Sequence, residues 1–199
     1  RINEEAPIMY DDLSMLLTTS GSTGSPKLVR HNYENVRTNA KNISAVFKLN
    51  ENENGMVSLP LQFTQGLNVA YSHLYSGSTV LLSTDTIAQG QFWSFFEENK
   101  ATSFTGVPYS YEVLDKLRFF RMDLPHLKTI NEGGGRLSNE LFMKCAEYAV
   151  NTKRKFIATY GATETTSRMA YLPPELAISK CGSIGVPLPD ATMKLVDED

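Results

Sequence analysis

The sequence has few of the residues from which metal centres and disulfide frameworks are built. Its 199 residues include only 2 cysteines and 3 histidines. The histidines His31, His73 and His126 lie far apart, and none of their spacings matches a zinc site. We expect them to be surface or supporting residues. Cys145 and Cys181 form no disulfide framework, which favours a reducing compartment, so a cytoplasmic location is expected.

Excess positive charge and long apolar runs are also missing. The 19 Lys and Arg residues are outnumbered by 22 Asp and Glu residues, which gives a net charge of −3. Such a balance excludes the basic surface that nucleic-acid binding requires. No apolar run approaches the ~20 residues that span a bilayer, and no signal-peptide pattern opens the chain. We therefore expect neither a nucleic-acid partner nor a membrane span.

The order of apolar runs and helical stretches predicts the fold class. Short apolar runs, expected to be strands, alternate with helical stretches of about ten or more residues: strands at 15–17, 29–30, 56–61, 79–83, 102–107, 127–131 and 156–159, helices at 32–47, 66–75, 92–100, 109–119 and 138–150. This alternation predicts an α/β fold with a mostly parallel, doubly wound sheet flanked by helices. In such sheets ligands bind beyond the carboxyl ends of the strands.

The last part of the chain differs in composition. Prolines there separate short strand patterns near Ile184 and from Met193 to Val196. We therefore divide the chain into an α/β core, residues 1–170, and the start of a small β-rich subdomain, residues 171–199.

Four aromatic residues gather on one expected helix: Phe92, Trp93, Phe95 and Phe96. They could line a pocket for an acyl group. Aromatic residues at helical spacing more often pack against a sheet, however, so we predict that they belong to the core.

A loop rich in glycine and hydroxyl residues follows the first expected strand. Every residue from Thr18 to Ser25 is glycine, serine or threonine, and Pro26 and Lys27 follow. Glycines let the backbone approach a ligand closely, consecutive N–H groups in such a turn bind anions, and a lysine suits phosphate. A solvated linker is the alternative, but a linker seldom follows directly on a buried strand. The loop is not a Walker A motif, because Lys27 follows proline rather than glycine.

A second motif follows the last long strand, in the run Tyr160-Gly161-Ala162-Thr163-Glu164-Thr165. An aromatic ring can stack on a purine, and the glycine permits a tight turn. The threonine hydroxyl can donate to a phosphate oxygen. The glutamate is a hard oxygen ligand suited to Mg²⁺ that already bridges phosphates. Alone, the run could be a surface turn with a single acid.

These motifs together resemble the AMP-forming adenylate synthetases, which include acyl-CoA synthetases, peptide-synthetase adenylation domains and luciferases. Thr19 to Lys27 match the family's phosphate loop, although Leu28 replaces its final glycine, and Tyr160 to Glu164 match its Tyr-Gly-x-Thr-Glu signature. Gly133 to Leu137 resembles the Gly-Gly-Ala-Pro-Leu segment, with departures at the third and fourth positions. Gly182 to Pro189 resembles the family's Gly-Ser-Ile-Gly-x-Pro-x-Pro block.

The resemblance implies ATP and AMP as nucleotides, Mg²⁺ as metal and a thiol, CoA or a carrier protein, as acyl acceptor. It assigns catalytic roles to Lys27 at the β- and γ-phosphates, Thr163 at the α-phosphate and Glu164 at the metal. The implied nucleotide-binding residues are those of the phosphate loop, the triple glycine and the start of the signature: Thr19, Ser20, Gly21, Ser22, Thr23, Gly24, Gly133, Gly134, Gly135, Tyr160 and Gly161.

The implied reaction joins a carboxylic acid to ATP, giving acyl-AMP and pyrophosphate, and then transfers the acyl group to the thiol. The segment from Pro60 to Gly66 contains no aspartate to hold a substrate amine, which favours a fatty, aryl or other amine-free acid over an amino acid. An amino-acid-activating domain and a non-catalytic module that binds ATP or acyl-AMP remain alternatives. A phosphotransferase is disfavoured, because no Walker A loop or catalytic Asp-Asn pair is present.

The ends of the chain suggest a segment of a longer enzyme. The sequence starts at Arg1, without a methionine, and stops at Asp199 within a strand-like pattern. In the family, a ribose-binding aspartate lies downstream of the Gly-Ser-Ile-Gly block and an adenylation lysine lies on a small C-terminal domain. We therefore expect these 199 residues alone to be inactive.

Overall fold

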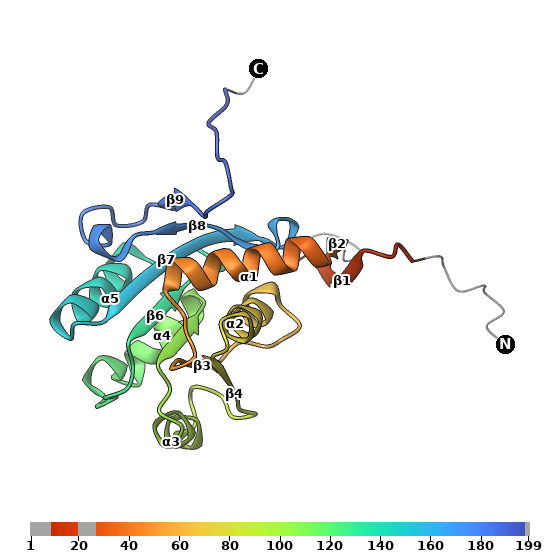
Figure 1. The fold of residues 1–199 in the computed structure, drawn as a ribbon. Helices are drawn as coiled ribbons and strands as arrows, with labels where there is room; N and C mark the ends of the chain where they lie inside the picture. The colour runs from red at the N-terminus through yellow and green to blue at the C-terminus, as the bar shows by residue number, and fades with distance from the viewer. Residues whose placement is uncertain (1–8, 20–26, 198–199) are drawn as a thin grey trace.

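The structure is a computed structural model that describes residues 9–19 and 27–197. Its centre is a seven-stranded sheet in the order β4-β3-β5-β6-β7-β8-β9, and β1 and β2 form a separate two-stranded sheet (Figure 1). The strands are β1 (Leu13–Thr18), β2 (Leu28–Asn32), β3 (Asn54–Val57), β4 (Thr79–Leu82), β5 (Ser103–Gly106), β6 (Thr129–Glu132), β7 (Lys155–Ala162), β8 (Ser167–Leu172) and β9 (Val186–Pro187).

Five α-helices and three 3₁₀ turns connect the strands of the described chain. They are α1 (Tyr33–Phe47), α2 (Thr64–Tyr75), α3 (Gly90–Glu98), α4 (Pro108–Lys116), η1 (Phe119–Arg121), α5 (Asn139–Asn151), η2 (Thr163–Thr165) and η3 (Pro174–Leu176). The expected N-caps are confirmed: the Asn32 side chain accepts from Asn35 N–H at 2.7 Å, and Ser138 Oγ accepts from Leu141 N–H at 3.3 Å.

The direction of the strands confirms the predicted fold class. Strands β4, β3, β5, β6 and β7 are parallel, while β8 and β9 run antiparallel at one edge. The prediction of a strand from Met193 to Val196 was wrong, because residues 188–197 form neither helix nor strand. The end of the described chain leads away from the sheet (Figure 1). Strand β8 includes residue 170, and β9 extends the same sheet. The division of the chain into a core and a β-rich subdomain at residue 170 stays a prediction.

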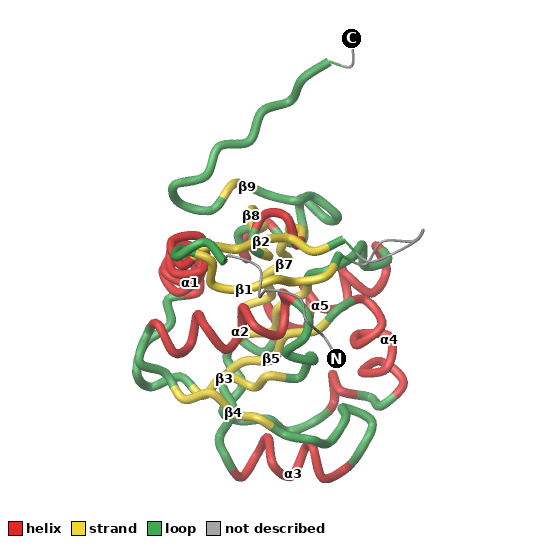
Figure 2. Tube along the Cα trace, turned by 90° about the vertical axis from the view of Figure 1, so that its right-hand side faces the viewer, coloured by secondary structure: helices red, strands yellow, loops and turns green. Residues whose placement is uncertain are grey.

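The two faces of the sheet contact different helices. Alternate residues of a strand point to opposite faces. On β7, Phe156 packs in the larger core with residues of α4 and α5, whereas Ile157 packs with Ile43 and Phe47 of α1. Figure 2 shows the β1–β2 hairpin beside α1 and α2, on the second of these faces.

The aromatic residues of α3 belong to the core, as predicted. Phe92 and Phe96 are fully buried, and Trp93 and Phe95 pack against the same core. The centroids of the Trp93 and Phe119 rings lie 5.7 Å apart. In the part of the chain that the structure describes, no helix is long and apolar enough to cross a membrane.

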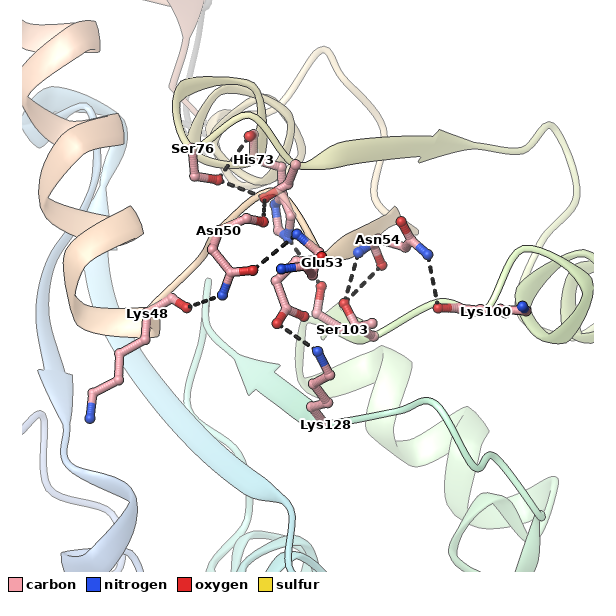
Figure 3. A network of polar contacts seen from close by, with 12 residues as sticks. Lys48, Asn50, Glu53, Asn54, His73, Ser76, Lys100, Ser103 and Lys128 are labelled. Atoms are coloured by element: carbon pink, nitrogen blue, oxygen red, sulfur yellow. Dashed lines mark hydrogen bonds and ion pairs between the residues drawn. The ribbon is translucent and has the colours of Figure 1, made fainter.

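A polar network joins the amino ends of the central strands (Figure 3). His73 of α2 is buried, with Nδ1 2.8 Å from the Val69 carbonyl oxygen and Nε2 3.3 Å from Ser103 Oγ. Its ring occupies the space beside Gly55, where an added Cβ would lie 2.3 Å from the imidazole. Lys128 pairs with Glu53 at 2.8 Å. His73 is therefore a structural residue at the end of the sheet opposite to the motif-bearing loops.

Candidate functional site

The predicted glycine motifs meet at the carboxyl ends of β6 and β7. These neighbouring strands are parallel, so the loops that follow them lie at one edge of the sheet. A pocket of about 510 Å³ lies between them. It is lined by parts of both motifs and by a segment far along the chain: Glu132, Gly134, Gly135, Arg136, Leu137, Phe142, Ala158, Thr159, Tyr160, Gly161, Gly182, Ser183 and Ile184.

The triple glycine leaves the backbone bare at the pocket wall. An added Cβ on Gly133 would lie 2.5 Å from Thr159 Oγ1 and 2.7 Å from Gln65 Nε2, so no side chain fits. Gly134 has φ +82°, a conformation that side-chain-bearing residues rarely adopt. Gly134 and Gly135 are exposed, and their peptide groups can contact a flat ligand directly.

Gly161 permits a close approach of two strands. Its Cβ, if present, would lie 1.5 Å from the Ser167 carbonyl oxygen. A bulge interrupts the β7–β8 pairing between Tyr160 and Gly161. The strand does not end at Thr159, as expected, but continues to Ala162. The Tyr160 side chain remains 45% exposed at the pocket, where its ring can stack on a ligand.

Thr163 and Glu164 lie on the η2 turn directly after β7. The turn is closed by Thr165, whose hydroxyl accepts from Ala162 N–H at 3.1 Å and donates to Ala162 O at 3.0 Å. Glu164 is exposed and faces a neighbouring hollow of about 410 Å³ shared with Asn35 and Asp190. The structure therefore places Glu164 one turn away from Tyr160, in a different hollow.

The Glu164 carboxylate fits a magnesium ion that brings most of its own ligands. Among the described residues, no group of three or more His, Cys, Asp or Glu side chains could enclose a metal. Mg²⁺ usually keeps several waters and binds through one or two carboxylates together with substrate phosphates. The single exposed carboxylate of Glu164 is compatible with that requirement.

The β1–β2 hairpin holds the ends of the predicted phosphate loop. Thr19 N–H donates to the Lys27 carbonyl oxygen at 3.1 Å, and the Lys27 side chain is exposed. The remaining predicted loop residues, Ser20, Gly21, Ser22, Thr23 and Gly24, lie outside the described residues.

A contact between His31 and Thr166 places this hairpin beside the η2 turn. His31 Nδ1 lies 3.3 Å from Thr166 Oγ1, across 135 residues of sequence. Burial lowers the pKa of His31, so a neutral imidazole is favoured at this contact. The β1–β2 hairpin and the η2 turn are thus neighbours in space.

Arg168, which the sequence analysis did not single out, is fully enclosed behind the motif. It is 2% exposed, and it donates to Asn68 Oδ1 at 2.7 Å and to Asn131 Oδ1 at 2.6 Å. Its guanidinium lies 5.1 Å from the centre of the Phe47 ring. Burial lowers its pKa to about 9, and no carboxylate of the described chain pairs with it. No sequence pattern marks this arginine as buried.

Glu132 is a second functional candidate that sequence reasoning missed. It is the last residue of β6, is 4% exposed and lines the 510 Å³ pocket. Burial raises its pKa to about 8. The sequence feature that could have identified Glu132 is its position as an acidic residue between a buried strand and three glycines.

Comparison with known proteins gives matches over nearly the whole chain. The family model described as "AMP-binding enzyme" matches residues 2–199. A feruloyl-CoA synthase from Amycolatopsis sp is 30% identical over 185 residues, which are 92% of this chain and 37% of that protein.

Two solved structures of o-succinylbenzoate CoA synthetase from Bacillus subtilis share the fold. A double mutant bound to the product analogue OSB-NCoA has a TM-score of 0.80 and 27% identity, over 90% of this chain and 36% of that one. The complex with ATP and magnesium ion has a TM-score of 0.75 and 26% identity, over 87% of this chain and 35% of that one. The chain thus spans little more than a third of the length of these proteins.

Proposed function

Because the chain belongs to the AMP-binding enzyme family, we propose that it forms the nucleotide-binding core of an AMP-forming acid–thiol ligase. The whole protein would join a carboxylic acid to ATP, release pyrophosphate and pass the acyl group to CoA or a carrier thiol. The 199 residues alone are proposed to be inactive.

One observation supports this proposal most directly, namely the contact between His31 and Thr166. It brings the hairpin that bears the phosphate loop beside the turn that bears Thr163 and Glu164. A nucleotide with its base at Tyr160 could extend its phosphates along η2 towards Lys27. The arrangement suits a triphosphate better than the isolated motifs would.

In the proposed reaction, a carboxylate oxygen attacks the α-phosphorus of ATP, and the bond to the departing pyrophosphate breaks. Catalysis would come from positioning and charge stabilisation. Thr163 would donate to the α-phosphate, Lys27 would hold the β- and γ-phosphates, and Glu164 would bind Mg²⁺. The metal, when bound, neutralises charge that develops on the phosphate oxygens.

An amine-free acid, aryl or fatty, is the proposed substrate class. The segment from Pro60 to Gly66 offers no carboxylate to a substrate amine, and Phe63 is half exposed there. The two similar proteins described above are named for feruloyl and o-succinylbenzoyl groups, and both of these groups contain an aromatic ring. We place the enzyme in a reducing compartment such as the cytoplasm, since neither cysteine is paired in the structure.

The test is acid-dependent pyrophosphate release by the complete natural protein that contains these residues. A panel of aryl, fatty and amino acids, each with ATP and Mg²⁺, should give pyrophosphate with at least one amine-free acid, and AMP should form once thiol is added. Release of ADP instead would indicate a phosphotransferase. Binding of ATP without any acid-dependent turnover would indicate a non-catalytic module.

A further inference from the structure

Glu132 places a carboxyl group without a hydrogen-bond partner in the wall of the pocket. Its neighbour Asn131 points to the opposite face of the sheet, where it bonds to Arg168. Glu132 therefore points to the α4 and α5 face, and it lines the pocket together with Leu137 and Phe142. Within the described chain, Oε1 is fully buried and has no hydrogen-bond partner. A buried polar atom of this kind usually has a partner, and here a ligand can provide it.

The surroundings of Glu132 favour its uncharged form. The titratable groups that face it are Tyr111 of α4 and Cys145 of α5, both buried, and the charge of Glu132 helps to raise both of their pKa values. Arg136 lines the same pocket but makes no ion pair with Glu132, and Arg168 lies on the other face of the sheet. With burial alone raising its pKa to about 8, Glu132 is mostly a carboxylic acid at neutral pH.

We propose that the Glu132 carboxyl group recognises the adenine base, donating its O–H to a ring nitrogen and accepting from the exocyclic amine. This inference rests on the proposed function, because it requires the base to occupy the 510 Å³ pocket beside Tyr160. Tyr160 would stack on any purine, and Glu132 would select adenine over guanine.

The chemistry of the base edges explains the selectivity. Adenine presents an N7 acceptor beside an N6 amine donor, a pair that a side-chain amide binds with two hydrogen bonds. A carboxylic acid has the same donor and acceptor pair as an amide. Guanine presents two acceptors, N7 and O6, at the corresponding edge. A carboxylate can only accept, so deprotonation of Glu132 would also remove one of the two bonds.

The experiment is calorimetric titration of the complete natural protein with AMP and with GMP, at pH 7 and pH 9. AMP keeps an ionised phosphate over this range. In the natural protein, AMP affinity should fall about tenfold from pH 7 to pH 9 as a group with a pKa of about 8 loses its proton. Glu132→Gln, which keeps a donor and an acceptor but does not titrate, should bind AMP well and equally at both pH values.

Glu132→Leu should lose at least about tenfold in AMP affinity at pH 7 and little or none in GMP affinity. Glu140→Leu is the matched control, because Glu140 is exposed on α5 and does not line the pocket. Equal AMP affinity in Glu132→Leu and the natural protein would overturn the inference while leaving nucleotide binding intact. A fall in AMP affinity from pH 7 to pH 9 that persists in Glu132→Gln would also overturn the inference. This variant provides the test if Glu132→Leu does not fold. No AMP binding by the natural protein would instead overturn the proposed function, and the inference with it.

Discussion

Substitution of Gly161 by alanine tests whether the site depends on the close contact between β7 and β8. The new Cβ would lie 1.5 Å from Ser167 O, whereas real Cβ contacts essentially never fall below 3.0 Å. The obstacle is backbone, so β8 must move by roughly 1.5 Å or more. Overpacking of this kind costs about 1–3 kcal/mol, and two weakened ladder hydrogen bonds add ~1 kcal/mol each. We expect a loss of about 3–5 kcal/mol in the free energy of unfolding.

Two other glycines provide controls for this experiment. Gly55→Ala also creates a clash, at 2.3 Å, but with the His73 ring at the other end of the sheet. It should cost about 1–3 kcal/mol of stability and leave nucleotide affinity unchanged. Gly90→Ala meets nothing within 4 Å at the start of α3. It should raise stability by about 0.4–1 kcal/mol.

The assay is a urea titration followed by circular dichroism, together with AMP binding measured below the unfolding transition. Gly161→Ala should lower both stability and AMP affinity, because the bulge that positions Tyr160 is displaced. If the free energy of unfolding of Gly161→Ala lies within about 1 kcal/mol of that of the natural protein, the steric argument is refuted. A difference of this size is no larger than the effect expected for the unhindered Gly90→Ala. A loss of stability with unchanged AMP affinity would show that Tyr160 does not depend on the bulge.

Three further predictions concern charged residues. Glu164→Gln should slow pyrophosphate release at least tenfold at limiting Mg²⁺ without changing stability, since Glu164 is exposed; an unchanged rate would contradict its role. Arg168→Met should lower the free energy of unfolding by about 2–4 kcal/mol, measured by urea unfolding. Two asparagine oxygens lose charge-assisted hydrogen bonds, and removal of a desolvated cation offsets only part of that loss. Because the pKa of Glu132 is higher in the folded state than in the unfolded state, protonation of Glu132 stabilises the fold. This contribution is fully present below about pH 4.5 and is lost as pH rises through about 8. Glu132→Gln should therefore flatten the pH dependence of unfolding and be more stable at pH 8 by on the order of 1–3 kcal/mol; parallel pH profiles would contradict this.

Local sequence patterns predicted the elements whose formation depends on local interactions. The helical spacing after Asn32 and the cap at Ser138 gave α1 and α5 to within about a residue, and the aromatic residues of α3 proved to be core. Apolar runs bounded by turns gave the parallel strands. These features arise from periodicity and capping, which act over a few residues.

Features that depend on a distant partner could not be predicted in this way. The continuation of β7 beyond Thr159 requires β8, and the tight approach at Gly161 is visible only when both strands are present. The burial of His73 on α2 depends on the space left by Gly55 in β3. A charged residue such as Arg168 is normally assigned to the surface, because burial of an unpaired charge is costly. Its burial is tolerated because Asn68 and Asn131 accept hydrogen bonds from it and the Phe47 ring lies beside it.

Adjacent residues of β6 connect this buried network to the pocket. Asn131 faces α1 and α2 and receives a hydrogen bond from Arg168, which lies on β8 opposite Gly161. Glu132 faces the other side and contributes to the pocket wall. The Arg168–Asn131 bond therefore ties the strand that bears the glycine loop to the strand that borders the bulge. Because hydrogen bonds to a charged group in a desolvated site are strong and directional, this contact limits how far Tyr160 can move relative to Gly134. The buried cation of Arg168 can in this way fix the width of the pocket beside Tyr160.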